Sequence, residues 1–290
     1  MELVQAALDG LLFGTTYALI GIGFTLVFGV MHKINLSYAA ASIAGAYVSL
    51  AISRLVDLPV PIVYLIGGVA AGALGYLIYL TCFRYIPVKN PLATLMSSVG
   101  MLILLDEVVV HETDGIPQSY PPPFELPNLE FWSLSVRPDY LVVFGVSVAV
   151  MVVLMLVLYR TRLGIATRAV AQQPVAAQLC GISVQGTNAS TFVIAGVIGG
   201  IAGAMIGAAV GMLAPQLTLP VTVKGLIVTV IGGLGSIPGA IVAGLLVGAL
   251  EEFFKALWDV NLRDMAVLLL LYAFLVLRPS GLFGKSNLRD

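Results

Sequence analysis

The stretch "GVIGGIAGAMIGAAVG", residues 196–211, is sixteen residues long and carries no charge. Its glycines recur at spacings of three and four residues, at Gly196, Gly200, Gly203, Gly207 and Gly211. In a helix this spacing places small side chains along one face. Such faces let helices approach each other closely in lipid, where no hydrophobic force drives them together. The stretch therefore predicts a membrane helix packed tightly against its neighbours.

The composition extends this prediction to the whole chain. Of 290 residues, 59% are hydrophobic and 10% are charged, and the mean hydropathy is +1.03; a soluble domain is about 25% charged. Apolar spans recur at about 11–30, 34–53, 60–83, 92–110, 139–159, 190–213, 221–232, 237–256 and 264–278. The seventh is too short to cross a bilayer alone, which leaves eight or nine spans. We expect an all-α, polytopic membrane helix bundle forming one domain over residues 1–290, because helices satisfy their own backbone in lipid. By eye the sequence shows no strong internal repeat.

Charge predicts the orientation in the membrane. The loop at about 106–139 holds seven carboxylates against one Arg137, whereas the segment at about 160–188 holds three arginines and no acid. Basic loops stay in the cytoplasm. The first loop is therefore expected outside with the N-terminus, and the second segment inside. Lys224 and Glu251 lie close to predicted span ends, where long charged side chains reach toward water.

A second glycine-rich stretch, "IGGLGSIPGAIVAG" at 231–244, resembles a nucleotide-binding loop at first sight. It lacks both the third glycine of the dinucleotide motif and a preceding strand. A lookalike of the phosphate-binding loop at 279–286 begins with Pro279 in place of glycine. The stretch at 231–244 is instead predicted to break a helix, either beside a transport pathway or as a tight turn between two helices near the surface. The residues of this break are Gly232, Gly233, Gly235, Ser236, Pro238 and Gly239.

The basic segment predicts two short helices outside the bilayer. In "RLGIATRAVAQQPVAAQLCGIS", 162–183, one helix should end before Pro174. A second should begin at Pro174 and stop at Gly181. This helix pair is either a plain connection or a knob that docks a cytoplasmic partner. The chain has two histidines and neither an H-E-x-x-H nor a G-x-S-x-G motif, so we expect neither an enzyme nor a metal site.

Several blocks of the chain resemble a known family. Val175-Ala-Ala-Gln-Leu-Cys-Gly181 is similar to the E-A-A-x-x-x-G coupling motif of ABC importer permeases, with valine in place of glutamate. Three longer blocks, at 14–49, 160–184 and 223–252, and the ending "RPSGLFG" at 278–284 resemble permeases for branched-chain amino acids and related amides or urea. The likeness covers nearly the whole chain and points to the first of two paired permease subunits.

The resemblance implies a membrane-spanning permease subunit of a binding-protein-dependent ABC importer in the bacterial inner membrane. The partners would be membrane lipid, a second permease, two cytoplasmic ATPases that bind ATP and Mg, and a periplasmic or extracellular solute-binding protein. This chain would hold no cofactor, hydrolyse no ATP and bind no nucleic acid. Residues expected to couple to the ATPases are Arg168, Gln172, Pro174, Val175, Ala176, Ala177 and Gly181. The alternative is an ATP-independent secondary transporter or channel, although charges are scarce at midspan.

One departure from the family bears on the solute. Members usually read I-N-F-A-H-G-E where this chain has "INLSYAA", residues 34–40, so two ionisable groups are missing. Tyr38 and Ser42 lie four residues apart on one helix face, and we expect Asn35, Tyr38 and Ser42 to line the substrate pathway. The sequence leaves the identity of the solute and the choice between a homodimer and a heterodimer open.

Overall fold

The computed structural model describes residues 2–56, 58–86, 91–121, 129–131, 134–257 and 262–284. Its helices are α1 (Glu2–Met31), α2 (Ser37–Leu55), α3 (Val60–Ile78), α4 (Pro91–Thr113), α5 (Pro138–Arg160), α6 (Arg162–Gln172), α7 (Pro174–Leu179), α8 (Val184–Val210), α9 (Thr218–Gly232), α10 (Ile237–Leu257) and α11 (Leu262–Leu277). A π-helical turn, η1 (Tyr79–Arg84), extends α3, and a 3-10 turn, η2 (Pro215–Leu217), precedes α9. The short strands are β1 (Gln118–Ser119), β2 (Leu129–Phe131), β3 (Leu134–Val136) and β4 (Met212–Leu213). Eight helices within the described residues are long and apolar enough to cross a membrane, which confirms the predicted helical bundle.

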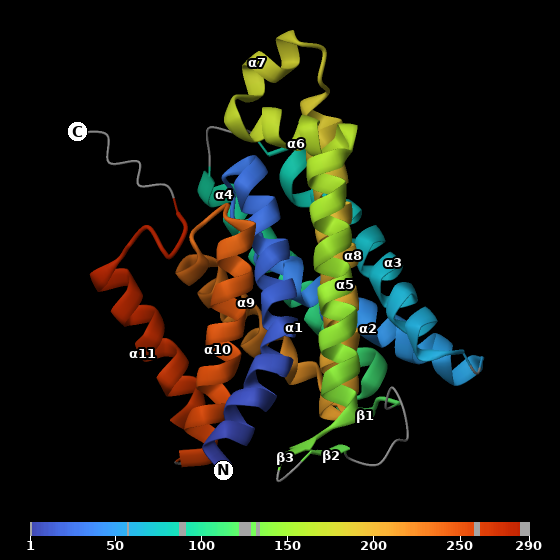
Figure 1. Ribbon diagram of the computed structural model, residues 1–290. Helices are drawn as coiled ribbons and strands as arrows, with labels where there is room; N and C mark the ends of the chain where they lie inside the picture. Colours follow the sequence, from blue (N-terminus) through green and yellow to red (C-terminus); the bar gives the residue numbers. More distant parts are fainter. Residues whose placement is uncertain are drawn as a thin grey trace.

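The two ends of the bundle differ in the way that the charge pattern predicts. Helices α6 and α7 stand at one end, and the N-terminus and the strands β1, β2 and β3 lie at the other (Figure 1). We refer to these as the cytoplasmic and external ends. At the external end β1 pairs antiparallel with β4, with Gln118 opposite Leu213. Two boundaries differ from the sequence prediction: α4 continues to Thr113, so residues 106–113 of the expected external loop are helix, and the seventh span begins at Pro215 rather than 221.

Eight helices fall into two sets with similar contacts, α1–α4 and α8–α11, while α5 packs on α1 and α8. Helix α1 packs along α10, and α8 packs along α3; α2 lies against α3 and α8, and α9 lies against α10 and α1. The outermost helices correspond too, since α4 rests on α2 and α11 rests on α9 and α10. Helices α1 and α8 run in opposite directions through the bundle (Figure 1). The arrangement is that of an inverted repeat, which the sequence alone does not reveal.

Glycines allow the closest contacts between the two sets. A Cβ atom added to Gly14 of α1 would lie 2.8 Å from the carbonyl oxygen of Gly244 on α10. Between α3 and α8, a Cβ on Gly67 would lie 3.3 Å from the carbonyl oxygen of Gly200. Both helix pairs therefore approach backbone to backbone, as the small-residue pattern predicts. Gly211 is an exception to the predicted face, because it ends α8 with a left-handed φ of 80°.

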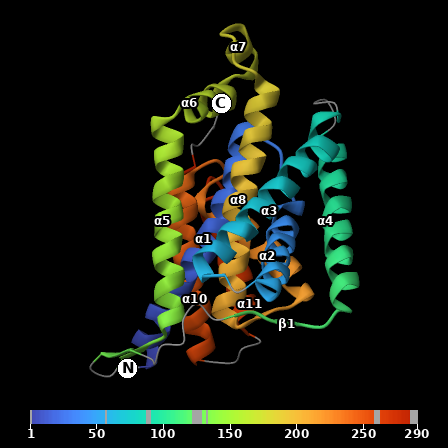
Figure 2. The same ribbon diagram turned by 90° about the vertical axis from the view of Figure 1, so that its right-hand side faces the viewer.

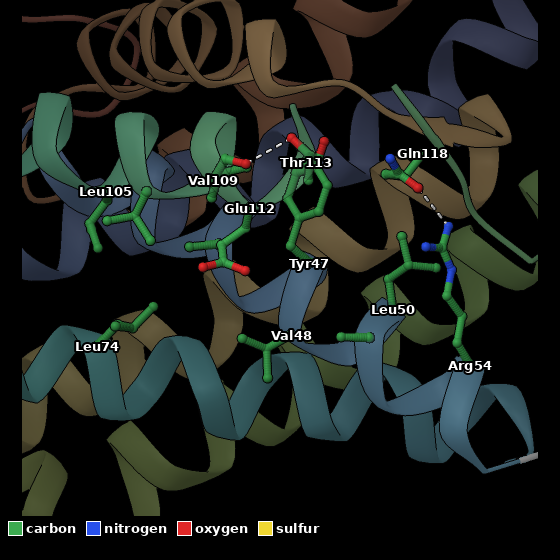
Figure 3. A pocket seen from close by; sticks show the side chains of 13 residues that line it. Tyr47, Val48, Leu50, Arg54, Leu74, Leu105, Val109, Glu112, Thr113 and Gln118 are labelled. Carbon is green, nitrogen blue, oxygen red and sulfur yellow. Dashed lines mark hydrogen bonds between the residues drawn. The ribbon is translucent and has the colours of Figure 1, made fainter. Parts of the chain in front are cut away.

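Helices α4 and α5 lie on opposite sides of the molecule and bury little of their surface. Figure 2 shows α5 at one edge and α4 at the other, with α1, α2 and α8 between them. Helix α4 packs on α2, η1 and η2 but makes few contacts with α3. A cavity of about 420 Å³ lies between α4 and the α2–α3 pair (Figure 3).

Candidate functional site: the cytoplasmic helix pair and the cavity beneath it

The sequence of the helix pair explains its local structure. Helix α6 begins behind Thr161, whose hydroxyl accepts a hydrogen bond from the backbone N–H of Gly164 at 3.4 Å. Gln173 is extended, with a φ of -157°, as expected of a residue before proline. Pro174 then occupies the first turn of α7. The predicted boundaries of both short helices are confirmed.

Helix α7 ends in a Schellman motif. Ile182 N–H donates to the carbonyl oxygen of Ala177 at 3.0 Å, and Gly181 N–H donates to that of Gln178 at 3.0 Å. Gly181 has a φ of 82°, which favours glycine at this position. Hydrogen bonds therefore define both the length of α7 and the direction in which the chain leaves it.

One face of α7 is anchored, and the other is open to solvent. Ala177 is buried with Val30 at the end of α1 and Val170 on α6, in a small cluster separate from the main core. On the open face Val175 is 67% exposed and Leu179 is 86% exposed. Apolar side chains this exposed, outside the bilayer and on a fixed base, suit contact with a partner.

A cavity of about 620 Å³ lies beneath the helix pair. It is lined by the ends of α1 and α5, by α6, by the turn between α9 and α10 and by the C-terminal residues Phe283 and Gly284. Predicted residues of two different kinds meet here: Arg168 and Gln172 from the coupling segment, and Gly235, Ser236 and Pro238 from the glycine-rich stretch. The structure thus joins two motifs that are about 65 residues apart in the sequence.

The cavity lining carries the positive charge of Arg168. Arg168 and His32 line it, and no carboxylate does so among the described residues. The Arg168 guanidinium carbon lies 5.2 Å from the ring centre of Tyr159, a cation–π contact that directs the side chain toward α5. Beside the cavity, partial burial lowers the pKa of Lys33. Thr25 also lines the cavity, and its buried hydroxyl finds no hydrogen-bond partner within the described ranges.

The glycine-rich stretch forms a tight turn between two helices. Helix α9 ends at Gly232, Gly233 adopts a φ of 98°, and the Ser236 hydroxyl accepts a hydrogen bond from Gly239 N–H at 3.2 Å at the start of α10. The C-terminal segment covers this turn, because Leu282 N–H donates to the carbonyl oxygen of Ile231 at 2.8 Å. The stretch is thus a turn between two helices, placed beside Gly29 near the end of α1; its place beside a transport pathway stays a prediction.

The three predicted pathway residues lie elsewhere, inside the bundle. Asn35, Tyr38 and Ser42 are each at most 3% exposed. The Tyr38 hydroxyl points between Gly23 of α1 and Gly199 of α8 and has no hydrogen-bond partner among the described residues. None of the three lines the cytoplasmic cavity. In this structure the three side chains pack between helices. Their place on a solute pathway stays a prediction.

The structure also corrects the expectation for Lys224 and Glu251, which do not reach toward water. Their side chains are 10% and 5% exposed, and Lys224 Nζ lies 2.8 Å from Glu251 Oε1. Asp264, Arg263 and the Tyr17 hydroxyl complete the cluster, at 3.3 Å from Lys224 or Glu251. The sequence does contain an indication that Glu251 is buried. Gly244, Gly248 and Glu251 follow one another at spacings of four and three residues, so Glu251 lies on the same face of α10 as these two glycines. No group of three or more potential metal ligands occurs among the described residues.

Comparisons with known proteins agree with this architecture. PsaBC from Streptococcus pneumoniae, solved in complex with Fab, matches with a TM-score of 0.50 and 15% identity, over 94% of this chain and 88% of that chain. This likeness concerns the fold alone. The high-affinity branched-chain amino acid transport system permease protein BraD of Pseudomonas aeruginosa is 32% identical over 294 residues, covering 97% of this chain and 96% of that protein.

A second relative gives the same result. The high-affinity branched-chain amino acid transport system permease protein LivH of Escherichia coli is 31% identical over 297 residues, covering 97% of this chain and 96% of its own length. Residues 6–277 match the family described as "Branched-chain amino acid transport system / permease component". The chain therefore belongs to the family of branched-chain amino acid transport permease components.

Proposed function

We propose that this chain is the permease subunit of a binding-protein-dependent importer for branched-chain or other small apolar amino acids. It would work in a bacterial inner membrane beside a second permease, with ATP hydrolysed by two separate cytoplasmic subunits. A solute-binding protein would deliver the amino acid to the external end. The relatives named as branched-chain amino acid permeases support the solute class.

The exposed apolar tip of α7 on its fixed base is the observation that carries this proposal. Val175 and Leu179 would enter a recess of an ATPase subunit, where contact depends on shape because α7 carries no charge. The base of α7 touches the end of α1 through Ala177 and Val30. Since α1 packs backbone to backbone along α10, a displacement of α7 would move α1 and α10 together.

The same displacement would reach the cytoplasmic cavity. Helix α6, the end of α1 and the turn before α10 all line this cavity, so relative motion among them opens or closes it. Arg168 would keep α6 attached to α5 through Tyr159. In this mechanism the cavity is the inner exit of the transport pathway, and the helix pair is the lever that acts on it.

The test is to place a carboxylate on the tip of α7. In Leu179→Asp and Val175→Asp variants, the ATPase chains recovered with the tagged permease should fall about tenfold or more, the loss typical of a central interface residue. ATP-driven uptake of L-leucine into proteoliposomes with the solute-binding protein should fall in parallel. Gln185→Asp is the control, because it adds the same charge at another exposed cytoplasmic position.

Two results would contradict the proposal. Full ATPase recovery and full uptake in Leu179→Asp would show that α7 is a plain connection. Uptake by the wild-type chain with no ATPase present would establish the alternative, an ATP-independent carrier or channel.

A further inference from the structure

A shallow groove of about 350 Å³ runs between α5 and α10 in the cytoplasmic half of the bundle. Helix α5 packs on α1 and α8 but scarcely contacts α10, so the groove stays open between the two helices. Residues 151–160 of α5 form most of it, and Ile241, near the start of α10, lies on the other side. These α5 residues span about 14 Å, close to half of the roughly 30 Å thickness of the hydrocarbon core. The groove is therefore about as long as one leaflet of the membrane is deep.

The groove is apolar along most of this length. Its wall on α5 consists of side chains one turn apart on the same helix face: Met151, Val152, Met155 and Leu156. Val152 and Leu156 are exposed although they lie within a membrane span. Methionine side chains adapt their shape to a flexible neighbour. This part of the groove suits a hydrocarbon chain.

A cation stands at the cytoplasmic end of the groove. Arg160 is the last residue of α5 and of its membrane span, and it lines the groove beside Tyr159. Within the part of the chain that the structure describes, its guanidinium has no carboxylate partner, so its N–H donors are available to an anion. Arg162 at the start of α6 is exposed as well, and residues 160–188 contain no acid.

We propose that this groove binds one anionic phospholipid of the cytoplasmic leaflet. An acyl chain would lie along Met151, Val152 and Leu156. The lipid phosphate would accept paired hydrogen bonds from the guanidinium of Arg160. Arg162 would add attraction for a headgroup with a net negative charge, because anionic lipids draw basic residues at the cytoplasmic surface. The site goes beyond the proposed function, since neither the solute nor an ATPase enters it.

The position of the charge favours a phospholipid over the other apolar occupant, a helix of a second protein chain. A phospholipid places its phosphate at the membrane boundary and its acyl chains in the hydrocarbon. Arg160 and the apolar wall follow one another along the groove in that same order. A helix would satisfy the wall but would leave the arginine unpaired unless it carried a carboxylate at the same depth.

The lipid would also contact the junction between α5 and α6. Tyr159 lines both this groove and the cytoplasmic cavity. Its ring centre lies 5.2 Å from the guanidinium carbon of Arg168 on α6. A lipid held at Arg160 would therefore support one wall of the cavity from outside the bundle.

The experiment maps where a photoactivatable lipid attaches to the full chain in its complex. Nanodiscs of phosphatidylcholine receive a small share of one of two probes that carry the same diazirine-labelled acyl chain. One probe is phosphatidylglycerol, which is anionic, and the other is phosphatidylcholine, which is zwitterionic. After irradiation, the adducts are located and quantified by peptide mass spectrometry.

Adducts of the anionic probe should concentrate on residues 151–156 and on Ile241, and should exceed those of the zwitterionic probe. Arg160→Gln should reduce this preference about fivefold, the effect of one arginine near an anionic headgroup. Arg160→Lys keeps the charge and should keep most of the preference. Arg84→Gln is the matched control, because Arg84 is also exposed at the cytoplasmic end beside a tyrosine.

A second pair of variants tests the apolar part of the groove without changing a charge. Val152→Trp should fill the groove and lower the adduct yield of both probes there. Val153→Trp adds the same side chain at an exposed neighbouring position that does not line the groove, and it should leave the yield unchanged. Both substitutions replace exposed side chains, so the fold should tolerate them.

Three results of the lipid mapping would overturn the proposal. They are adducts spread evenly over the exposed faces of α4 and α5, equal yields from the two probes, and a preference that Arg160→Gln leaves unchanged. A fourth comes from Leu156→Cys: its cross-linking to another chain of the complex would identify a protein as the occupant.

Discussion

The buried ion pair between Lys224 and Glu251 gives the sharpest test of how this bundle is held together. The pair joins α9 to α10 at 2.8 Å, with the Lys224 ammonium also 3.3 Å from the Tyr17 hydroxyl of α1. We consider Lys224→Met and Glu251→Gln, two substitutions that remove one charge each and keep the approximate size of the side chain.

The size of the effect follows from the charge balance of the cluster. Lys224 and Arg263 carry two positive charges, and Glu251 and Asp264 carry two negative ones. Either single substitution leaves one charge in excess, but Glu251 keeps Arg263 as a partner and Lys224 keeps Asp264. The loss of folding free energy should therefore stay below the about 3–5 kcal/mol that a buried charge left without a partner costs. The double substitution restores neutrality, and the remaining Arg263 and Asp264 are 34% and 60% exposed. The double variant should therefore lose less stability than either single one.

The assay is the free energy of unfolding in mixed micelles, measured for all four members of the double-mutant cycle. The control is the pair of Lys255 and Glu252 on the same helix, 2.9 Å apart with Lys255 44% exposed. An exposed pair contributes at most about 1 kcal/mol, so Lys255→Met should have a small effect.

This reasoning is refuted if the loss of unfolding free energy in the double variant equals the sum of the losses in the two single variants. Additivity would mean that the two side chains do not interact across the α9–α10 interface. If Lys224→Met or Glu251→Gln loses no more stability than Lys255→Met, water reaches the cluster.

Two further predictions concern packing and orientation. Gly244→Leu should reduce the yield of folded protein on size-exclusion chromatography. The backbone of α1 lies against this glycine, and overpacking costs about 1–3 kcal/mol. Gly100→Leu is the control and should have little effect, because no atom lies within 4 Å of its Cβ position. A membrane-impermeant maleimide should label Cys180 in inside-out vesicles and not in intact cells, and Cys82 in neither. Equal loss in both glycine variants, or labelling of Cys180 from outside, would contradict these predictions.

Several features could be predicted from the sequence because they depend on local interactions. The membrane class follows from hydropathy, and the positions of α6 and α7 follow from Pro174 and Gly181, whose backbone preferences act within one turn. The stretch that resembles a coupling motif and the glycine-rich turn are likewise continuous in sequence. Their prediction needs no knowledge of distant neighbours.

The tertiary structure decided what depends on neighbours far apart in the chain. Whether Lys224 faces water or Glu251 depends on how α9 is rotated about its axis relative to α10. The hydropathy of the sequence does not determine this rotation. Tyr38 is buried because Gly23 and Gly199 leave space for its ring, and the two glycines lie on different helices. Arg54 and Glu112, from the ends of α2 and α4, line the same cavity between these helices although they are far apart in the sequence. The inverted pairing of α1 with α10 and of α8 with α3 arises in the same way, since shape complementarity between helix faces determines it and residue order along the chain does not.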